Sequence, residues 1–310
     1  MMRKVIGIGE IILDIIFKEE QPTIAVPGGS VFNGMVSLSR MGVPVSFIGE
    51  VGNDRVGKII TDFMQANGMA TEHIVRFADR KTPVSLAFLN ETKDAEYVFY
   101  TNHAVSPANA RFPVIQQDDI VVFGSYYALN PLHRERIAEL LEYAKSRKAI
   151  IYYDPNFRKS HAHDAVRVRS AVIENYESAC IVRGSDEDFL NLYGKTDMEQ
   201  VYKDEVQFYC KRFITTHGAQ GVNLFTETLR LHYDVAPIVP VSTIGAGDNF
   251  NAGFIYGLLK YNVGYHDLPS INEATWGKLI QCGIDFSAEV CQSDLNYLSA
   301  NTEGSNESKF

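Results

Sequence analysis

The chain has 310 residues, of which 45% are hydrophobic and 22% charged, a composition ordinary for a globular protein. Its net charge of −9 argues against a nucleic-acid partner, because neutralising a phosphate backbone requires clustered Lys and Arg. No apolar run approaches the roughly 18 residues of a membrane-spanning helix. No apolar signal segment precedes the first strand-like run, and the four cysteines lack paired metal-binding spacing. We therefore expect a cytoplasmic protein with reduced thiols, no membrane contact and no disulfide frame.

Short β-branched runs alternate along the chain with longer segments of helical periodicity. The predicted strands are residues 5–8, 45–48, 120–123, 149–153, 179–182 and 213–216, and the predicted helices are residues 31–41, 54–67, 131–148, 186–192 and 200–210. This alternation is typical of βαβ units and predicts an α/β fold, with a mostly parallel central sheet flanked by helices on both faces. We expect one such domain over residues 1–300, followed by a polar tail at 301–310.

Two stretches depart from this alternation and predict a small separate sheet. Residues 11–26 and about 84–103 have strand-like patterns with no helix between their parts, and the second reads as a hairpin turning around 91–95. Ligands of parallel sheets bind beyond the carboxyl ends of the strands, so a small sheet over that edge would act as a lid. Its exposed apolar face is also the expected contact of a homodimer.

The first candidate ligand-binding residues follow the first predicted strand. Asp14 lies just after Gly7-Ile-Gly-Glu, and Gly28-Gly29 leads into a helix that carries Asn33 in its first turn. Paired glycines permit close approach of a ligand to the backbone. An Asp and an Asn that converge there suit a polyhydroxylated ligand, because each can bond neighbouring hydroxyl groups. Ordinary turn glycines and helix caps are the alternative for each residue taken alone.

The most informative segment lies near the end of the chain, where residues 242–250 read Ser-Thr-Ile-Gly-Ala-Gly-Asp-Asn-Phe before an apolar helix. Such a turn gathers unpaired N–H groups and the positive end of a helix, which suits phosphate oxygens. A carboxylate at Asp248 would be repelled by phosphate unless it acted as a general base that deprotonates an attacking alcohol. A glycine-rich helix cap is the alternative.

Taken together, these segments closely resemble the ribokinase-like carbohydrate kinases of the PfkB family. The two family signatures correspond to residues 28–57 and 242–254, and the match covers most of the chain in the right order. The resemblance implies a β-lid and phosphorylation of a sugar hydroxyl with ATP and Mg2+. It also implies roles for individual residues: Asp14, Gly28, Gly29 and Asn33 as sugar ligands, Asp248 as catalytic base, and Gly245, Ala246 and Gly247 as amides of an anion hole.

Three further segments are similar to elements of this family. Thr215-Thr216-His217-Gly218-Ala219-Gln220-Gly221 is similar to its nucleotide loop, which implies that Thr216, Gly218 and Gly221 lie near ATP. Asp154-Pro155-Asn156-Phe157-Arg158 resembles a strand-end motif of fructokinases and ketodeoxygluconate kinases. Asn156 is then expected near the nucleotide, and Arg158 is expected to place a cation near substrate or phosphate, or else to form a surface salt bridge. In the lid, Tyr97 and Phe99 are candidates for sugar contacts or for lid packing.

Two departures from the family pattern concern cations. Ser242 stands where many members have an Asp that contributes to a monovalent-cation site, which leaves activation by K+ open. The element Asn-x-x-Glu, which organises magnesium through water, appears as Ser185-Asp-Glu-Asp188, a set that Mg2+ can tolerate because it keeps most of its waters. Small residues in segment 271–290, among them Gly277, Cys282 and Gly283, are candidates for an adenine slot or for core packing.

The sequence thus predicts an ATP-dependent sugar kinase that converts fructose to fructose 6-phosphate. The preference for fructose comes from the fructokinase-like segments 154–158 and 185–188, which is analogy within a family. Ribose, 2-keto-3-deoxygluconate and nucleosides are the alternative substrates. A different alternative is a sensor of sugar or nucleotide that kept the fold and lost catalysis. An NAD-binding dehydrogenase is excluded, because Gly7-Ile-Gly-Glu lacks the third glycine and the following helix.

Overall fold

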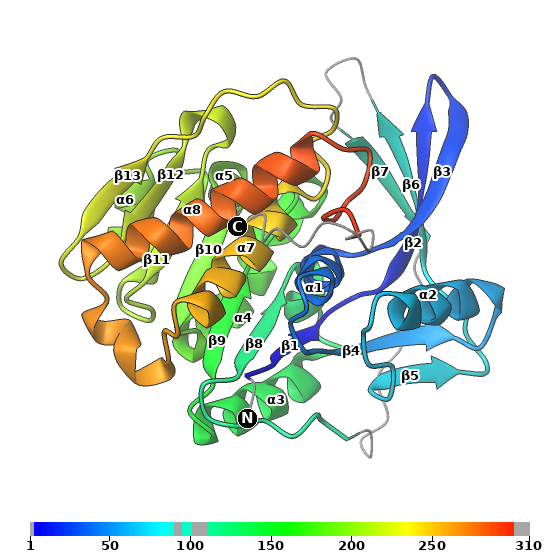
Figure 1. Cartoon of the computed structure of the whole chain (residues 1–310), viewed down its shortest axis with the longest axis horizontal. Coiled ribbons are helices and arrows are strands. Elements are labelled where there is room, and N and C mark those ends of the chain that lie inside the picture. Colours follow the sequence, from blue (N-terminus) through cyan, green and yellow to red (C-terminus); the bar gives the residue numbers. More distant parts are fainter. Residues whose placement is uncertain (1–2, 90–94, 101–110, 301–310) are drawn as a thin grey trace.

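The computed structural model describes residues 3–89, 95–100 and 111–300, and a large, mostly parallel sheet forms its centre (Figure 1). The strand order is β13-β12-β11-β10-β9-β8-β1-β4-β5. The strands are β1 (Val5–Ile8), β4 (Val45–Gly52), β5 (Ile74–Phe77), β8 (Ile120–Gly124), β9 (Ile150–Asp154), β10 (Ile181–Ser185), β11 (Phe213–Thr216), β12 (Val222–Phe225) and β13 (Arg230–Tyr233). All neighbours pair in parallel except β11–β12 and β12–β13. The predicted sheet is confirmed.

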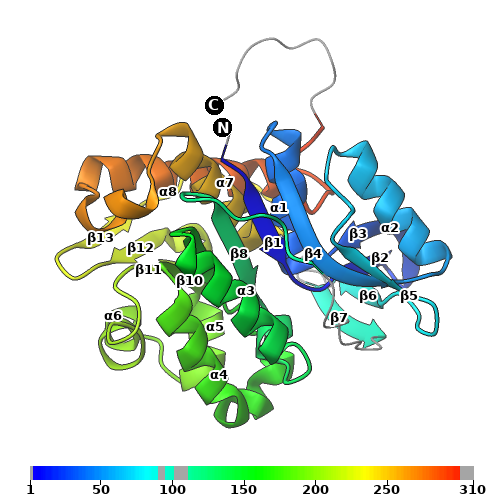
Figure 2. The same ribbon diagram turned by 90° about the horizontal axis from the view of Figure 1, so that it is seen from below.

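Helices cover both faces of this sheet (Figure 2). Figure 2 shows α1, α7 and α8 on one face and α3, α4 and α5 on the other. The helices are α1 (Ser30–Arg40), α2 (Arg55–Ala66), α3 (Arg134–Ser146), α4 (Ala165–Ser178), α5 (Asp186–Tyr193), α6 (Met198–Val201), α7 (Ala246–Lys260) and α8 (Glu273–Cys291). This arrangement buries the sheet between two apolar layers, which explains the nearly continuous apolar composition of the central strands.

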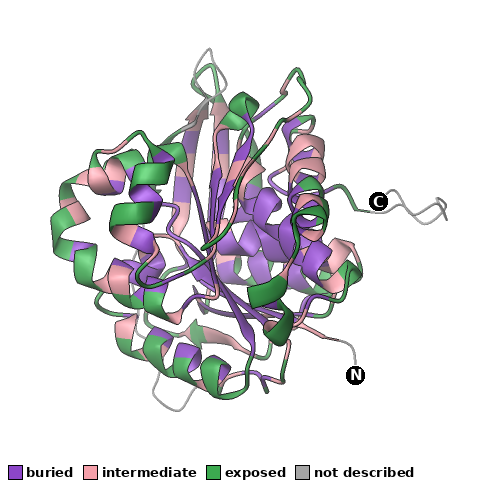
Figure 3. Ribbon diagram, turned by 90° about the vertical axis from the view of Figure 1, so that its left-hand side faces the viewer, coloured by how far each residue is buried: buried purple, intermediate pink, exposed green. Residues whose placement is uncertain are grey.

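Burial follows the layers of the fold (Figure 3). In β1, Val5 belongs to the apolar cluster that contains α1, α7 and α8 residues, whereas Ile6 and Ile8 belong to the cluster on the opposite face. Alternate side chains of a strand point to opposite faces, so one strand contributes to both layers. Because most neighbouring strands are parallel, their carboxyl ends and the loops that follow them lie at one edge of the sheet. Among the described residues, no helix is long and apolar enough to cross a bilayer.

Most predicted elements are found close to their expected bounds, and the differences have local causes. The helix predicted at 200–210 is instead α6, which continues into a short π-helical segment at Tyr202–Val206. Helix α4 and strands β5, β12 and β13 were missed. Helix α4 carries Val166 at 90% exposure, so its apolar residues do not form a clean stripe. Strands β5 and β13 are partly exposed edge elements, in which burial does not select an apolar pattern.

A second, four-stranded sheet is attached to the main body, as predicted. Its order is β3-β2-β6-β7, with β2 at Ile12–Lys18, β3 at Gln21–Gly28, β6 at Val84–Leu89 and β7 at Ala95–Tyr100. The β2–β6 pair is parallel and the other two pairs are antiparallel. Strands β6 and β7 pair antiparallel, as the expected hairpin requires. Of the turn expected at 91–95, residue 95 already belongs to β7, and residues 91–94 and the expected extension at 101–103 lie outside the described residues. Whether this sheet acts as a lid stays a prediction.

Candidate active site

Asp248 lies in the first turn of α7, and its carboxyl group is buried and held by two side chains of α1. Ser30 Oγ donates to Oδ1 at 3.0 Å, and Asn33 Nδ2 donates to Oδ2 at 2.8 Å. Burial raises the pKa of Asp248 to about 6, although these two hydrogen bonds and the charge of Arg158 act in the opposite direction. A buried carboxyl that is oriented on both oxygens and titrates near neutrality is suited to accept a proton.

Asp14 in β2 faces the same region from the small sheet. Its side chain is buried, Ser85 Oγ of β6 donates to Oδ1, and burial raises its pKa to about 6, with the charge of Asp248 contributing. A Cβ added to Gly28 would lie 2.0 Å from Asp14 Oδ2 and 3.7 Å from Asn33 Oδ1. The structure therefore brings Gly28, Asp14 and Asn33 together, as the sequence predicts.

Asn33 supplies the one orphaned acceptor of this group. Its Oδ1 is buried and has no hydrogen-bond partner among the described residues, whereas its Nδ2 is committed to Asp248. A buried acceptor without a donor is costly, so a ligand that brings a hydroxyl group to this atom would relieve the cost. Gly29 serves the same region through its backbone. Its φ is 129°, and a Cβ there would lie 2.3 Å from the carbonyl oxygen of Glu10.

The turn before α7 has the geometry of a glycine-dependent helix start. Gly245 has φ of 78°, and a Cβ there would lie 2.6 Å from the Asn296 carbonyl oxygen. The Ala246 N–H donates to the Thr243 carbonyl at 3.2 Å, so this amide is engaged in the turn itself. Of the three amides expected to form an anion hole, that of Ala246 is therefore committed to a local bond in this structure. Gly247 lies in the turn directly before Asp248.

A buried ion pair that sequence reasoning missed lies behind this turn. Arg183 of β10 donates from Nη1 to Asp154 Oδ2 at 2.9 Å and from Nη2 to Thr216 Oγ1 at 2.5 Å. Both charged side chains are about 5% exposed or less. The available signal was an Arg that directly follows the apolar run Ala179-Cys-Ile-Val182. Thr216, predicted to lie near the nucleotide, thus ends β11 beside a fixed cation.

Residues 154–158 connect this ion pair to Asp248. Asp154 Oδ1 accepts the Asn156 N–H at 3.0 Å, and Asn156 Nδ2 donates to Ser30 Oγ. Arg158 is exposed, and its charge lowers the pKa values of both Asp248 and Asp188. Asn156 and Arg158 therefore lie next to the Asp248 group, which is consistent with an expected place near substrate or phosphate.

Ser185 and Asp188, the expected magnesium element, form a capping box at the start of α5. The Ser185 N–H and Oγ donate to Asp188 Oδ2 at 2.7 and 2.8 Å, and the Asp188 N–H donates back to Ser185 Oγ at 3.1 Å. Burial raises the pKa of Asp188, with the charge of Asp154 adding to the effect. No cluster of three metal-ligating side chains occurs within the described ranges. Asp188 is buried and its Oδ2 is engaged in this cap, so these residues could help to hold a metal ion only through water, as a hydrated Mg2+ allows.

For the other residues predicted to lie near the nucleotide, the structure shows a local structural role in some cases and none in others. Gly218 has φ of 53° and is surrounded by open space, since no heavy atom lies within 4 Å of an added Cβ. Gly221 has φ of 99°, and its added Cβ would lie 2.4 Å from the Tyr233 carbonyl oxygen, so the hairpin β12–β13 already requires it. Cys282 and Gly283 of α8 pack directly against Gly253 and Phe250 of α7, which is the core role left open by the sequence.

The small sheet presents Phe99 in the same row as the Asp14 group. Asp14 pairs with Ser85 across β2–β6, and Ser85 pairs with Phe99 across β6–β7, so these residues share one face. Phe99 is 46% exposed, which leaves its ring accessible from that face. Tyr97 lies two residues earlier in β7, and its side chain is outside the described part of the structure.

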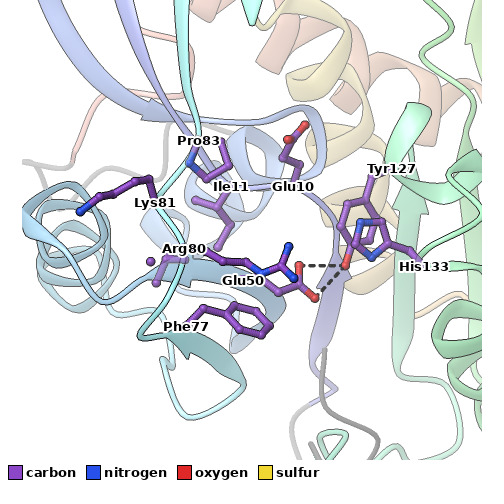
Figure 4. A pocket seen from close by; sticks show the side chains of 11 residues that line it. Glu10, Ile11, Glu50, Phe77, Arg80, Lys81, Pro83, Tyr127 and His133 are labelled. Carbon is purple, nitrogen blue, oxygen red and sulfur yellow. Dashed lines mark hydrogen bonds between the residues drawn. The ribbon is translucent and has the colours of Figure 1, made fainter. Parts of the chain in front are cut away.

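A separate pocket lies at the junction of the small sheet with the main body (Figure 4). Tyr127 Oη donates to both oxygens of Glu50, at 3.1 and 3.0 Å, and the Tyr127 ring stacks on His133 at 4.0 Å. Burial raises the pKa of Glu10 to about 7, and the charges of Asp14 and Glu50 add to the effect. Sequence reasoning did not predict this pocket, because its residues come from four separated segments.

Comparison with known proteins places this geometry in a family context. The model of the pfkB family carbohydrate kinases matches residues 2–302. The fructokinase of Vibrio alginolyticus is 25% identical over 266 residues, which cover 84% of this chain and 85% of that protein. Aminoimidazole riboside kinase from Salmonella enterica, complexed with aminoimidazole riboside and an ATP analogue, superposes with a TM-score of 0.80 at 21% identity. Fructokinase from Vibrio cholerae O395, with fructose, ADP and calcium bound, gives 0.79 at 22%. Each structure covers 94% of both chains, which shows a shared fold.

Proposed function

Because the chain belongs to the pfkB family of carbohydrate kinases, we propose that it transfers the γ-phosphoryl group of ATP to the primary hydroxyl group of fructose, forming fructose 6-phosphate and ADP. The observation that carries the proposal is the Asp248 carboxyl group, buried at the start of α7 and held on both oxygens by Ser30 and Asn33. A carboxylate held in this way would be oriented to deprotonate a sugar hydroxyl group, and the helix start beside it favours phosphate.

The residues of this chain divide the work between binding and proton transfer. Asp14 and the orphaned Oδ1 of Asn33 would accept hydrogen bonds from sugar hydroxyl groups. Asp248 in its ionised form would take the proton of the attacking hydroxyl as the new O–P bond forms and the bond to ADP breaks. Asn33 Nδ2 and Ser30 keep that carboxylate aimed while the proton moves.

The negative charge that develops on the transferring group meets positive groups from two directions. The positive end of the α7 dipole lies at the N-terminus of the helix, beside Gly247. Arg158 adds a full positive charge near Asp248. Mg2+ bound with ATP would neutralise phosphate oxygens, with Asp188 facing its hydration shell. The closing of the small sheet would exclude water from the site.

We prefer fructose among the sugars because the two Vibrio fructokinases are similar to this chain over most of its length and of theirs. Residues 154–158 also resemble a fructokinase motif. Ribosides are the second class, favoured by the similarity to the Salmonella riboside kinase. These preferences rest on relatives of about one-quarter identity or less. Substrate identity is therefore the part of the proposal to be tested first.

The test is ADP release by the purified chain with ATP and Mg2+ against fructose, ribose, 2-keto-3-deoxygluconate and aminoimidazole riboside. The expected result is the highest kcat/KM with fructose and formation of fructose 6-phosphate. A higher kcat/KM with another acceptor would change the proposed substrate but leave the proposed kinase activity standing. Binding of sugar and ATP without any ADP release would indicate a sensor and reject the catalytic proposal. Asp248→Asn is the matched variant, and it should lose about 10²–10⁴-fold in kcat while retaining ATP binding.

A further inference from the structure

Arg183 is a charged residue in the interior of the molecule, and the reaction described above does not use it. Its side chain is 5% exposed, its guanidinium bonds Asp154 and Thr216, and its Cζ lies 5.3 Å from the centre of the Phe250 ring in α7. Its Nε is buried without a partner among the described residues. Buried ion pairs are weak evidence for stability, because the desolvation of both charges can exceed their attraction. The pair therefore calls for another explanation.

The guanidinium lies directly behind the start of α7. A Cβ added to Gly247 would be 3.0 Å from Arg183 Nη1 and 3.2 Å from Nη2. A cation at the positive end of a helix is unfavourable unless a negative charge offsets it. Asp154 supplies that charge, and it is fixed further by Asn251 of α7, whose Nδ2 donates to Asp154 Oδ2 at 2.6 Å.

An unbroken series of hydrogen bonds leads from this pair to Asp248. Asp154 Oδ1 accepts the N–H of Asn156 at 3.0 Å. Asn156 Nδ2 donates to Ser30 Oγ, and Ser30 Oγ donates to Asp248 Oδ1 at 3.0 Å. The series joins the ends of β9 and β10 to the first turns of α1 and α7. With Thr216 at its other end, it connects the expected nucleotide side to the expected base.

We propose that Arg183 is a positioning residue for phosphoryl transfer, which holds Asp154 in place and thereby fixes the Asp248 carboxylate. The inference rests on the proposed role of Asp248 as base. Arg183 is 5% exposed, and its guanidinium is engaged with Asp154 and Thr216. It acts through the series of hydrogen bonds and through its charge.

The loss of the Arg183 charge should change the pKa of Asp248, and a pH profile can detect this change. Burial is the largest cause of the raised pKa of Asp248, and among the charged groups near it Arg158 lowers the pKa whereas Asp154 raises it. Asp14 also lies within range, since the charge of Asp248 raises the pKa of Asp14. Arg183 itself faces Asp154, Tyr152 and Asp188. Removal of its charge leaves Asp154 without a neutralising partner, so Asp248 should require a higher pH to ionise.

The experiment compares pH profiles of kcat/KM for the sugar in the full chain. Arg183→Gln should lower kcat about tenfold or more and move the acid limb upward by at least about 0.5 pH unit. Arg183→Lys keeps the charge and should leave the limb at its wild-type pH, with a smaller loss in kcat. Arg134→Gln is the control, because Arg134 is also part of a partly buried network, with Asn175 and Glu174, on the far side of the sheet. An unmoved or lowered limb in Arg183→Gln would overturn the inference.

A double variant keeps the test decisive if the single variant Arg183→Gln does not fold. Arg183→Gln combined with Asp154→Asn leaves no uncompensated buried charge. Because Asp154 itself raises the pKa of Asp248, the double variant should bring the acid limb back to the wild-type pH or below it, while kcat stays reduced. A wild-type kcat in this double variant would count against a positioning role. The two proposals also fail separately. If Asp248→Asn keeps full turnover, the base assignment is wrong; if it is inactive while Arg183→Gln behaves as wild type, only the positioning role of Arg183 is wrong.

Discussion

At the scale of single residues, burial and hydrogen bonding act in opposite directions on the pKa of Asp248. Burial raises its pKa to about 6, and the bonds from Asn33 and Ser30 hold it lower than burial alone would. Only the ionised form can act as base. If Asp248 is the base, as proposed, activity should fall when the pH drops below this pKa, because the carboxylate is then protonated.

We therefore expect kcat/KM for the sugar to lose about tenfold per pH unit below a midpoint near pH 6. Ser30→Ala removes one bond to the ionised carboxylate and should move this midpoint upward. Ser39→Ala is the control, since Ser39 lies on the same helix and bonds the Asn67 carbonyl away from the site. The measurement is a pH profile from about 5 to about 8.5, which spans this midpoint on both sides. A midpoint that Ser30→Ala leaves in place would contradict the role of that bond.

Gly28 offers a test of the sugar side at the same scale. A methyl group there would lie 2.0 Å from Asp14 Oδ2, so Gly28→Ala must displace the carboxylate. We expect the KM for sugar to rise roughly tenfold or more, with the KM for ATP unchanged. Gly9→Ala serves as the control, because its nearest neighbour would be Val31 at an ordinary 3.4 Å. Equal effects on both substrates would point to a general disturbance of the fold instead.

The individual residues show which parts of the candidate site could be predicted from the sequence and which could not. Asp14 and Asn33 were predicted from the residues to converge beyond the first strand, whereas the place of Gly28 and Asp248 beside them was implied by the family resemblance. Ser85 and Arg183 were missed, although they hold Asp14 and Asp154. Their side chains reach the site only through the pairing register of β2 with β6 and of β10 with β9 and β11. Register between distant strands is a property of the folded chain, and no local pattern reports it.

At the scale of elements, the start of α7 depends on one backbone conformation. Gly245 combines φ of 78° with a carbonyl oxygen 2.6 Å from an added Cβ, and helix α1 approaches so closely that a Cβ on Gly34 would lie 2.9 Å from the Asp248 carbonyl oxygen. The position of Asp248 is therefore set by two close backbone contacts. Flexible side chains alone do not set it.

Gly245→Ala should destabilise the protein by about 2 kcal/mol or more and lower kcat, because the left-handed conformation and the contact with Asn296 both penalise a side chain. Gly42→Ala provides a matched control. Gly42 has nearly the same φ, 77°, but no atom lies within 4 Å of its added Cβ. It should cost about 1 kcal/mol and leave kcat unchanged. Urea unfolding and steady-state kinetics report the two effects. Equal losses for both variants would show that φ alone matters.

The elements also differ in how well the sequence predicts them. The central strands were found because burial on both faces demands continuous apolar runs, as in β8, where all five residues are buried. Helix α4 and the edge strands were missed because exposure on one side weakens the pattern. The irregular continuation of α6 at Tyr202–Val206 likewise leaves no signature in residue spacing.

At the scale of the whole molecule, three neighbouring carboxyl groups have raised pKa values, and the charge of Asp14 acts on Glu10 as the charge of Asp248 acts on Asp14. Glu10 titrates near 7, and Asp14 and Asp248 near 6. Their folded pKa values exceed their unfolded ones, so each contributes stability that is fully present at low pH and is lost as pH rises through its folded pKa. At neutral pH these carboxylates lower the stability of the protein.

Glu10→Gln should therefore raise the free energy of unfolding at pH 8, by roughly 1.4 kcal/mol per unit of pKa shift removed, and change it little at pH 4. The difference from wild type should grow between about pH 4.5 and 7, the unfolded and folded pKa values of this group. Urea unfolding at several pH values measures it. Glu142→Gln is the control, because the Glu142 side chain is 73% exposed. A loss of stability in Glu10→Gln at pH 8 would show that the carboxylate makes favourable contacts instead.

The placement of Asp14 has one further consequence. This residue belongs to a strand of the small sheet, whereas Asp248 belongs to a helix of the main body. If Asp14 binds the acceptor and Asp248 deprotonates it, as proposed, a bound sugar contacts the small sheet and the main body at the same time. The sugar would then help to hold the small sheet against the main body, and we expect ATP hydrolysis without sugar to be much slower than phosphoryl transfer to it.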